Sequence, residues 1–193
     1  MPSDPVLLAF DTSAAHCAAA LLSGDRVLAS AAQDMGRGQA EHLIPLLEGL
    51  LSQAAKSWAD LSAIGVGTGP GNFTGIRISV SAARGLALGL DIPAIGVSTF
   101  EAIQTATPGL MPAVPGPRGK AYVLRDTPEL IDLETLGEET HAFPPAPDGL
   151  AVAIGKVALS KLDGPHSSPA PLYVKPADAA PARDLPPVIL DDA

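Results

Sequence analysis

The sequence predicts an α/β fold, in which strands and helices alternate along the chain. Three short apolar runs open the chain, later apolar runs alternate with helical patterns, and a glycine-rich turn joins one run to a long helix. Short apolar runs bounded by turn residues are typical of buried strands, whereas helices repeat apolar residues every three or four positions. We therefore expect the element order βββαβαβα over residues 1–106.

The opening strands are expected at Val6–Phe10, Cys17–Leu22 and Arg26–Ala31. The first run ends at a polar turn, and Ser23-Gly24-Asp25 separates the second from the third. Such turns connect strands over short distances.

A helix is expected over Gln39–Ala55 after a polar loop, although Pro45 interrupts its hydrogen bonding. Its apolar residues share one face. This face comprises Leu43, Leu47, Leu50, Leu51 and Ala54. In the connector that follows, Trp58 is expected to fill the core.

The stretch that organises the chain begins with a strand at Ile64–Gly67 and continues through a glycine-rich turn. The helix that follows should start near Phe73 or Thr74, with Asn72 as its cap, and end near Leu90. One face carries Ile76, Val80, Ala83, Ala87 and Leu90, and a second stripe carries the small residues Gly75, Ser79 and Ala82. We expect the small stripe to let a partner helix come close.

The character of the chain changes after a further strand at Ile92–Gly96 and a short helix opened by the capping box Ser98–Glu101. Fifteen of the 20 prolines lie beyond residue 105, which disfavours long regular elements. Short strands are expected at Lys120–Leu124 and Ala151–Ile154, a short helix at Lys156–Leu162, and extended coil over residues 165–187. This organisation predicts an N-terminal domain over residues 1–106 and a reduced α/β subdomain with a tail over residues 107–193.

Charge and cysteine content narrow the classes of function. A net charge of −9 argues against a chain that grips a nucleic-acid backbone by itself. The lone cysteine, Cys17, excludes an internal disulfide and favours a reducing cytoplasm. The apolar opening contains Asp11 and His16, so we expect neither a membrane span nor a signal peptide.

Two turns could together form a nucleotide site. Its candidate residues are Asp11, Thr12, Ser13, Gly69 and Gly71. The turn at residues 67–71 lacks the Lys-Ser/Thr ending of a phosphate-binding loop, and Asn72 stands where the dinucleotide fingerprint needs glycine. We favour a structural turn there, with Asp11 capping the other turn.

No catalytic residue, metal site or cofactor is expected. The four histidines are scattered without helical ligand spacing, there is no Gly-x-Ser-x-Gly motif, and Cys17 lies in an apolar strand. Arg77 and Arg84, seven residues apart on the long helix, are either solvated or paired with acidic groups of a partner.

Several motifs resemble one known family. They are LLAFDTSA from Leu7, QAEHLIPLLEGLL from Gln39, GTGPGNFTGIR from Gly67, GVSTFEA from Gly96 and PLYVKPADAA from Pro171. Together they are similar to the TsaB (YeaZ) family, strongly over about the first 105 residues. The element order resembles the ribonuclease-H-like half of the actin-like ATPase (ASKHA) superfamily. The second half departs from the family pattern, since Pro115–Tyr122 replaces its usual Asp-Ala-Arg-containing strand.

The resemblance implies a non-catalytic dimerisation subunit of the bacterial complex that makes N6-threonylcarbamoyladenosine at position 37 of tRNAs. Its implied partners are a catalytic TsaD-like paralogue, a TsaE-like ATPase and, in the absence of the catalytic partner, a second copy; tRNA would be contacted only indirectly. Where the catalytic relative carries metal-binding histidines, this chain has Thr99 and Ile103. The helices Gln39–Ala55 and Phe73–Leu90 would form the interface. The residues expected there are His42, Leu43, Leu46, Leu50, Gly75, Arg77, Ile78, Ser79, Ala82 and Arg84.

Two alternatives stay open. One is an ATP-dependent phosphotransferase of the same superfamily, acting through Asp11 and the turn at residues 67–71. The other is a metallo-glycoprotease, which the missing ligand pairs make the weakest.

Overall fold

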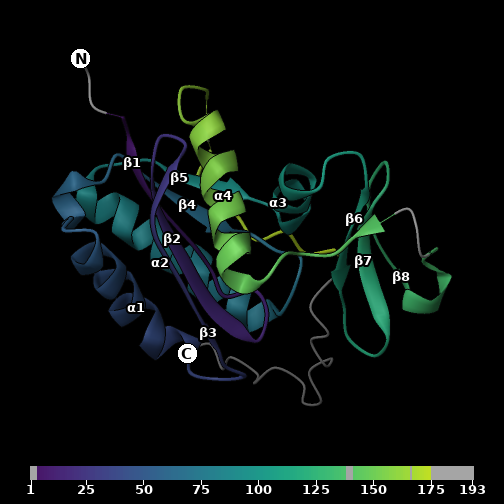
Figure 1. The fold of residues 1–193 in the computed structure, drawn as a ribbon. Coiled ribbons are helices and arrows are strands. Elements are labelled where there is room, and N and C mark those ends of the chain that lie inside the picture. Colours follow the sequence, from purple (N-terminus) through teal and green to yellow (C-terminus); the bar gives the residue numbers. More distant parts are fainter. Residues whose placement is uncertain (1–3, 138–140, 166, 175–193) are drawn as a thin grey trace, which may run out of the picture.

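The computed structural model describes residues 4–137, 141–165 and 167–174. Its main feature is a five-stranded sheet in the order β3-β2-β1-β4-β5 (Figure 1). β1 pairs antiparallel with β2 and parallel with β4, and β5 extends the sheet in parallel beside β4. The strands are β1 Val6–Asp11, β2 His16–Ser23, β3 Arg26–Asp34, β4 Ala63–Gly67 and β5 Ala94–Val97. This is the strand arrangement of the predicted ribonuclease-H-like fold.

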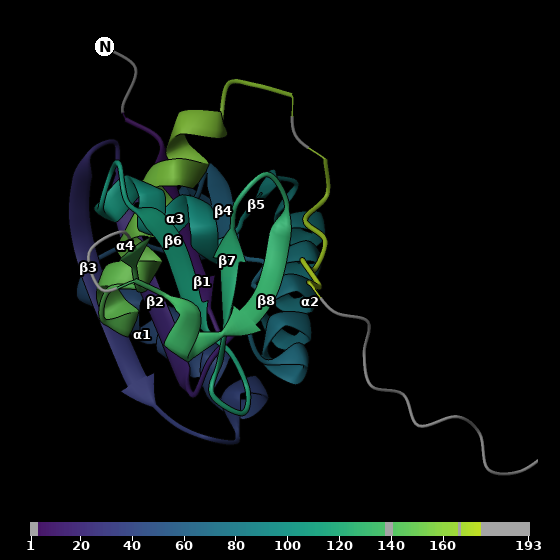
Figure 2. The same ribbon diagram turned by 90° about the vertical axis from the view of Figure 1, so that its right-hand side faces the viewer.

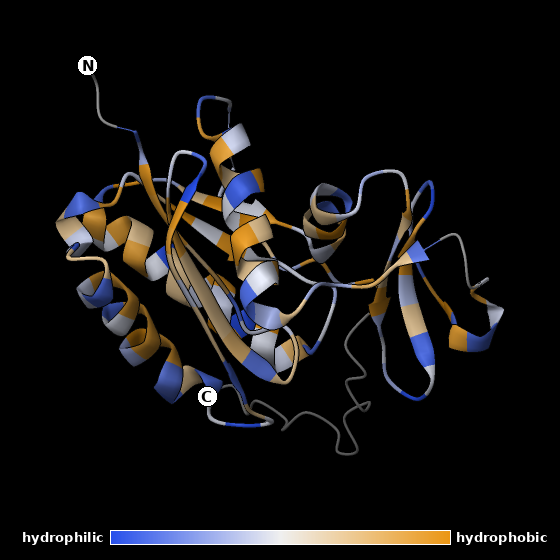
Figure 3. Ribbon diagram, in the orientation of Figure 1, coloured by the Kyte–Doolittle hydropathy of each residue, from blue (hydrophilic) through white to orange (hydrophobic). Residues whose placement is uncertain are grey.

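Helices cover both faces of this sheet. On one face, α1 (Gln39–Gln53) and α2 (Phe73–Leu90) pack against Leu8 and Phe10 of β1. On the other, α4 (Pro147–Lys161) packs against Leu7 and Ala9 of the same strand. Because both faces are covered, β1 is apolar at successive positions instead of alternating with polar residues, and hydrophobic colours gather on the central strands in Figure 3.

A second, four-stranded sheet in the order β8-β7-β6-β9 follows α3 (Thr99–Ala106). Its strands are β6 Met111–Pro115, β7 Lys120–Leu124, β8 Pro128–Asp132 and β9 His141–Ala142. Phe100 and Ile103 of α3 pack against Val114 of β6. The boundary expected after residue 106 coincides with the end of α3 and stays a proposal, with α4 returning across it to the first sheet.

Short 3-10 helices occur at η1 (Trp58–Asp60), where the partly buried Trp58 packs against the core, and at η2 (Leu133–Thr135). None of the helices within the described ranges is long and apolar enough to cross a membrane.

Two expectations for the second half are wrong. The strand expected at Ala151–Ile154 and the short helix expected at Lys156–Leu162 are parts of one helix, α4. Its apolar run packs against the sheet and α3, and an apolar run without clear periodicity does not distinguish a strand from a buried helix. Three strands, β6, β8 and β9, were not expected. The coil expected over residues 165–187 falls mostly outside the described residues; among 165 and 167–174 the structure has neither helix nor strand.

Candidate functional site

The turn after β1 and the turn before α2 are bonded directly to each other. The backbone N–H of Asn72 donates to the carbonyl oxygen of Ser13 at 2.6 Å, and Thr12 Oγ1 donates to the carbonyl oxygen of Gly75 at 2.7 Å. A Cβ at Gly71 would overlap the Ser13 carbonyl oxygen, and one at Gly75 would overlap that of Thr12. Glycine is therefore required at both positions, because backbone meets backbone there.

The N-terminus of α2 is capped as predicted. Asn72 Oδ1 accepts a hydrogen bond from the N–H of Gly75 at 2.9 Å, which satisfies one of the free donors of the first helical turn. The cap and the bonds to the first turn fix the direction in which α2 leaves the sheet.

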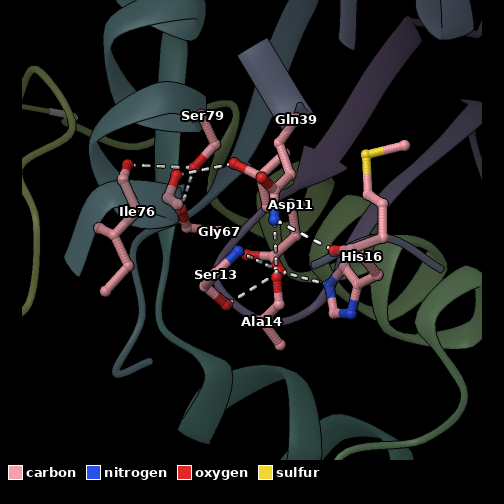
Figure 4. Close-up of polar contacts among 11 residues, drawn as sticks. Asp11, Ser13, Ala14, His16, Gln39, Gly67, Ile76 and Ser79 are labelled. Carbon is pink, nitrogen blue, oxygen red and sulfur yellow. Dashed lines mark hydrogen bonds and ion pairs between the residues drawn. The ribbon is translucent and has the colours of Figure 1, made fainter. Parts of the chain in front are cut away.

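Asp11 is fully buried at the end of β1, where its carboxylate organises the turn (Figure 4). Its Oδ2 atom accepts hydrogen bonds from the Ser13 N–H at 3.0 Å and the Ser13 hydroxyl at 2.9 Å, and lies 2.8 Å from His16 Nε2. The capping role favoured for Asp11 thus agrees with these bonds. The pairing with His16 was not expected, although Asp11 ends one strand and His16 begins the next, and the short turn between two antiparallel strands brings such residues together.

This cluster does not have the geometry of a hydrolytic site. In a Ser–His–Asp site the serine hydroxyl is bonded to the imidazole that removes its proton. Here the Ser13 hydroxyl donates to the carboxylate, so His16 does not activate it. Nor do the described residues contain a group of three or more His, Cys, Asp or Glu side chains placed to hold a metal ion.

A cleft of about 730 Å³ lies beside this turn. Ser13, His16 and Gly71 border it on the side of the first sheet, and Lys120 and Tyr122 come from the second sheet. Its other aromatic residues are Phe73, Phe143 and Tyr173. Of the five residues expected at a nucleotide site, only Ser13 and Gly71 line this cleft; Asp11 and Thr12 are buried beneath it, so the site stays a prediction.

The exposed face of α2 forms a second candidate site. We define the α2 strip as Arg77, Ser81, Arg84 and Leu88, exposed residues at spacings of four, three and four. Leu88 has 86% of its surface exposed, more than any other large apolar side chain in the described ranges. Among the described residues, neither arginine of the strip forms an ion pair.

The stripe of small residues does not face outward as predicted. Ser79 is fully buried and its hydroxyl donates to the carbonyl oxygens of Gly67 and Ile76, while Gly75 packs on the turn after β1. Leu43 and Leu50 of α1 are buried in the same core. The expectation that Leu43, Leu50, Gly75 and Ser79 contact a partner is therefore wrong, because these side chains are already packed inside the chain.

The other expected interface residues are accessible to different degrees. His42, Arg77 and Arg84 are exposed. Leu46, Ile78 and Ala82 are partly buried at the edge of the core. Sequence reasoning missed Leu88, whose place on the strip could have been found from its spacing of four after Arg84.

The strand order and the helices on both faces define the ribonuclease-H-like, actin-like ATPase fold. Two solved structures share this fold. YeaZ from Pseudomonas aeruginosa has a TM-score of 0.67 and 23% identity, over 88% of this chain and 99% of that one. A Pseudomonas aeruginosa protein described as similar to peptidase YEAZ has a TM-score of 0.71 and 22% identity, over 89% of this chain and 100% of that one.

Sequence comparison identifies the family. The model of the family described as "TsaD: tRNA N6-adenosine threonylcarbamoyltransferase" matches residues 31–165, well over half of the chain. The chain therefore belongs to this family, and within it the chain is similar to TsaB (YeaZ) proteins. Two proteins named "tRNA threonylcarbamoyladenosine biosynthesis protein TsaB" are each 38% identical to it. The match to the Escherichia coli protein covers 49% of this chain and 40% of that protein. The match to the Bacillus subtilis protein covers 50% of this chain and 42% of that protein. The chain thus spans less than half the length of these relatives.

The chain is also 30% identical to an uncharacterised protein of Mycobacterium tuberculosis, and this match covers 82% of each chain.

Proposed function

We propose that the chain is a non-catalytic subunit of a complex that forms N6-threonylcarbamoyladenosine in tRNA, and that it docks a TsaD-type catalytic subunit. Its relatives named for this biosynthesis support the pathway. A buried serine that is bonded to a carboxylate, not to the imidazole, supports a role other than catalysis.

The observation that carries the docking role is the α2 strip. It combines two arginines without ion pairs in the described region with a leucine that is 86% exposed. Arginine is enriched where protein partners bind, and unpaired guanidinium groups suit carboxylates of a partner. α1 lies beside α2 and contributes His42 and the 37% exposed Ile44 to the same side of the sheet.

We further propose that a second copy of the chain occupies the same strip when the catalytic subunit is absent, and that a TsaE-type ATPase joins the assembled complex. Contact with tRNA would come through the partners, given the net charge of −9. The lone cysteine supports a cytoplasmic location.

The docking role is tested by measuring the affinity of the full chain for a purified TsaD-type subunit by calorimetry. Replacing Arg84 by Glu should weaken binding about tenfold or more, because a carboxylate would repel the acidic groups that the arginine attracts. Arg26→Glu makes the same charge change on the exposed β3 and should leave the affinity within about twofold. Equal effects of the two variants, or no complex with the unmodified chain at micromolar concentration, would reject the proposal.

The phosphotransferase alternative is less well supported, because protein atoms already join the two turns that would hold phosphate. Titration with ATP and Mg²⁺ distinguishes it: tight binding would favour the phosphotransferase, and millimolar or absent binding favours the docking subunit. No observation on the described residues favours a metallo-glycoprotease.

A further inference from the structure

A late segment of the chain runs beside α2. We define it as residues 167–173; in Figure 2 it lies next to α2 at the edge of the first sheet. The N–H of Leu172 donates to the carbonyl oxygen of Thr68 at 2.8 Å, and Pro169 is buried against Gly96 of β5. Segment 167–173 is thus held in place by the strand ends of the sheet that carries α2.

At the N-terminal end of α2, this segment joins the helix through aromatic rings. Tyr173 stacks on Phe73, with ring centroids 4.8 Å apart, and the Arg77 guanidinium lies 4.4 Å from the centroid of the Phe73 ring. Stacked rings and a cation over an aromatic ring are both attractive. Arg77 of the strip is therefore linked to segment 167–173 through one ring.

At the C-terminal end of α2, the segment forms the wall of a groove of about 520 Å³. Arg84 and Leu88 of the strip line one side, and Ser167–Pro169 line the other. Segment 167–173 is thus next to the α2 strip at both ends of the helix. Its exposed Tyr173 side chain lies at the N-terminal end, and the groove lies at the C-terminal end.

We propose that segment 167–173 is part of the surface that binds the TsaD-type subunit, with Tyr173 as its aromatic anchor; this rests on the proposed function. The two strip arginines would pair with carboxylates of the partner. Apolar side chains of the partner would fill the groove beside Leu88 and pack on Tyr173, which is 40% exposed. A partner helix or loop that carries both would contact α2 and segment 167–173 together. Tyrosine and arginine are among the residues enriched at the sites that contribute most to binding.

The test uses the full chain, a purified TsaD-type subunit and calorimetry. Tyr173→Ala should weaken binding about tenfold or more, as the loss of an aromatic anchor does, whereas Tyr173→Phe keeps the ring and should stay within about threefold. Ser168→Trp places a bulky ring at the exposed rim of the groove, and should weaken binding by a similar factor without burying any new group in the core. Leu133→Ala, at an equally exposed apolar side chain (40%) on η2, is the control that should leave the affinity unchanged. Melting temperatures of all variants within about 3 °C of the parent would confirm that they fold.

The outcomes separate the two proposals. If Arg84→Glu weakens binding while Tyr173→Ala and Ser168→Trp do not, this inference is wrong and the docking role stands. If the unmodified chain binds no TsaD-type subunit, both proposals fail. If Tyr173→Ala abolishes only self-association, measured by analytical ultracentrifugation, the occupant is a second copy and the inference as stated is overturned.

Discussion

Two glycines of α2 should respond oppositely to the same substitution. Gly75 faces the turn after β1, where a Cβ would overlap the carbonyl oxygen of Thr12, whereas a Cβ at Gly85 would meet no atom within 4 Å. Alanine favours the helical conformation over glycine by about 1 kcal/mol, so Gly85→Ala should stabilise the chain by roughly that amount. On the same helix, Gly75→Ala combines this gain with a steric cost.

The size of that cost follows from the contacts. Inserting a methyl group into a tightly packed site costs about 1–3 kcal/mol, and displacing the Thr12 hydroxyl from the Gly75 carbonyl oxygen, now 2.7 Å away, costs about 1 kcal/mol more. After subtracting the helical preference, the free energy of unfolding should fall by about 2 kcal/mol. For a chain of this length that corresponds to a melting temperature roughly 4–8 °C lower, against a rise of roughly 2–4 °C for Gly85→Ala.

Thermal unfolding followed by circular dichroism, together with urea titration, measures both variants. If Gly75 faced a partner helix, as its place in the stripe of small residues suggested, Gly75→Ala would stabilise the isolated chain as Gly85→Ala does. A melting temperature at or above that of the parent for Gly75→Ala would therefore refute the packing of α2 against the turn.

Three other predictions concern buried and paired groups. Asp11→Ala leaves the donors of Ser13 and His16 without their acceptor and should lower the free energy of unfolding by about 2 kcal/mol or more in urea titration; a loss below about 0.5 kcal/mol would contradict the network. Burial, with the nearby Asp11 carboxylate, raises the pKa of the Cys17 thiol to about 11, so iodoacetamide at pH 8 should label Cys17 only after unfolding, as mass spectrometry can establish. Burial alone would raise the pKa of Glu101, but hydrogen bonds from Lys161 and Ser98 outweigh it and lower that pKa. Because the folded pKa is the lower one, this carboxylate stabilises the fold above its unfolded pKa and the contribution is lost as the pH falls through the folded value. Lys161→Met should raise the Glu101 pKa in an NMR titration. It should lower the free energy of unfolding by less than about 1 kcal/mol at pH 7, since both side chains of the pair are more than a third exposed. An unchanged Glu101 pKa would argue against the ion pair.

The first half of the fold was predictable because each strand and helix is bounded by local signals. Asn72 caps α2 and the Ser98–Glu101 capping box opens α3, as expected. α4 was harder to predict, because it packs against both the sheet and α3 and its apolar run has little periodicity. Pro147 in its first turn and Lys161 in its last were the signals that could have located it.

The candidate site was less predictable for three physical reasons. A helical pattern identifies a stripe of small residues but not the backbone that packs on it, and at Gly75 that backbone is the chain's own. The stack of Phe73 on Tyr173 joins residues far apart in sequence, so no local pattern indicates it. Exposure, as at Leu88, becomes visible only once the sheet has placed α2.

The bond between Asn72 and Ser13 has a consequence for how the chain can be regulated. In an enzyme whose two phosphate-facing turns are bridged by a nucleotide, loading and release of that ligand can reorient the helix behind them. Here the bridge is part of the polypeptide, so the direction of α2 is set when the chain folds and does not await a small molecule. Under the proposed function, we expect any ATP dependence of the assembled complex to originate in another subunit, with this chain holding α2 in one fixed direction.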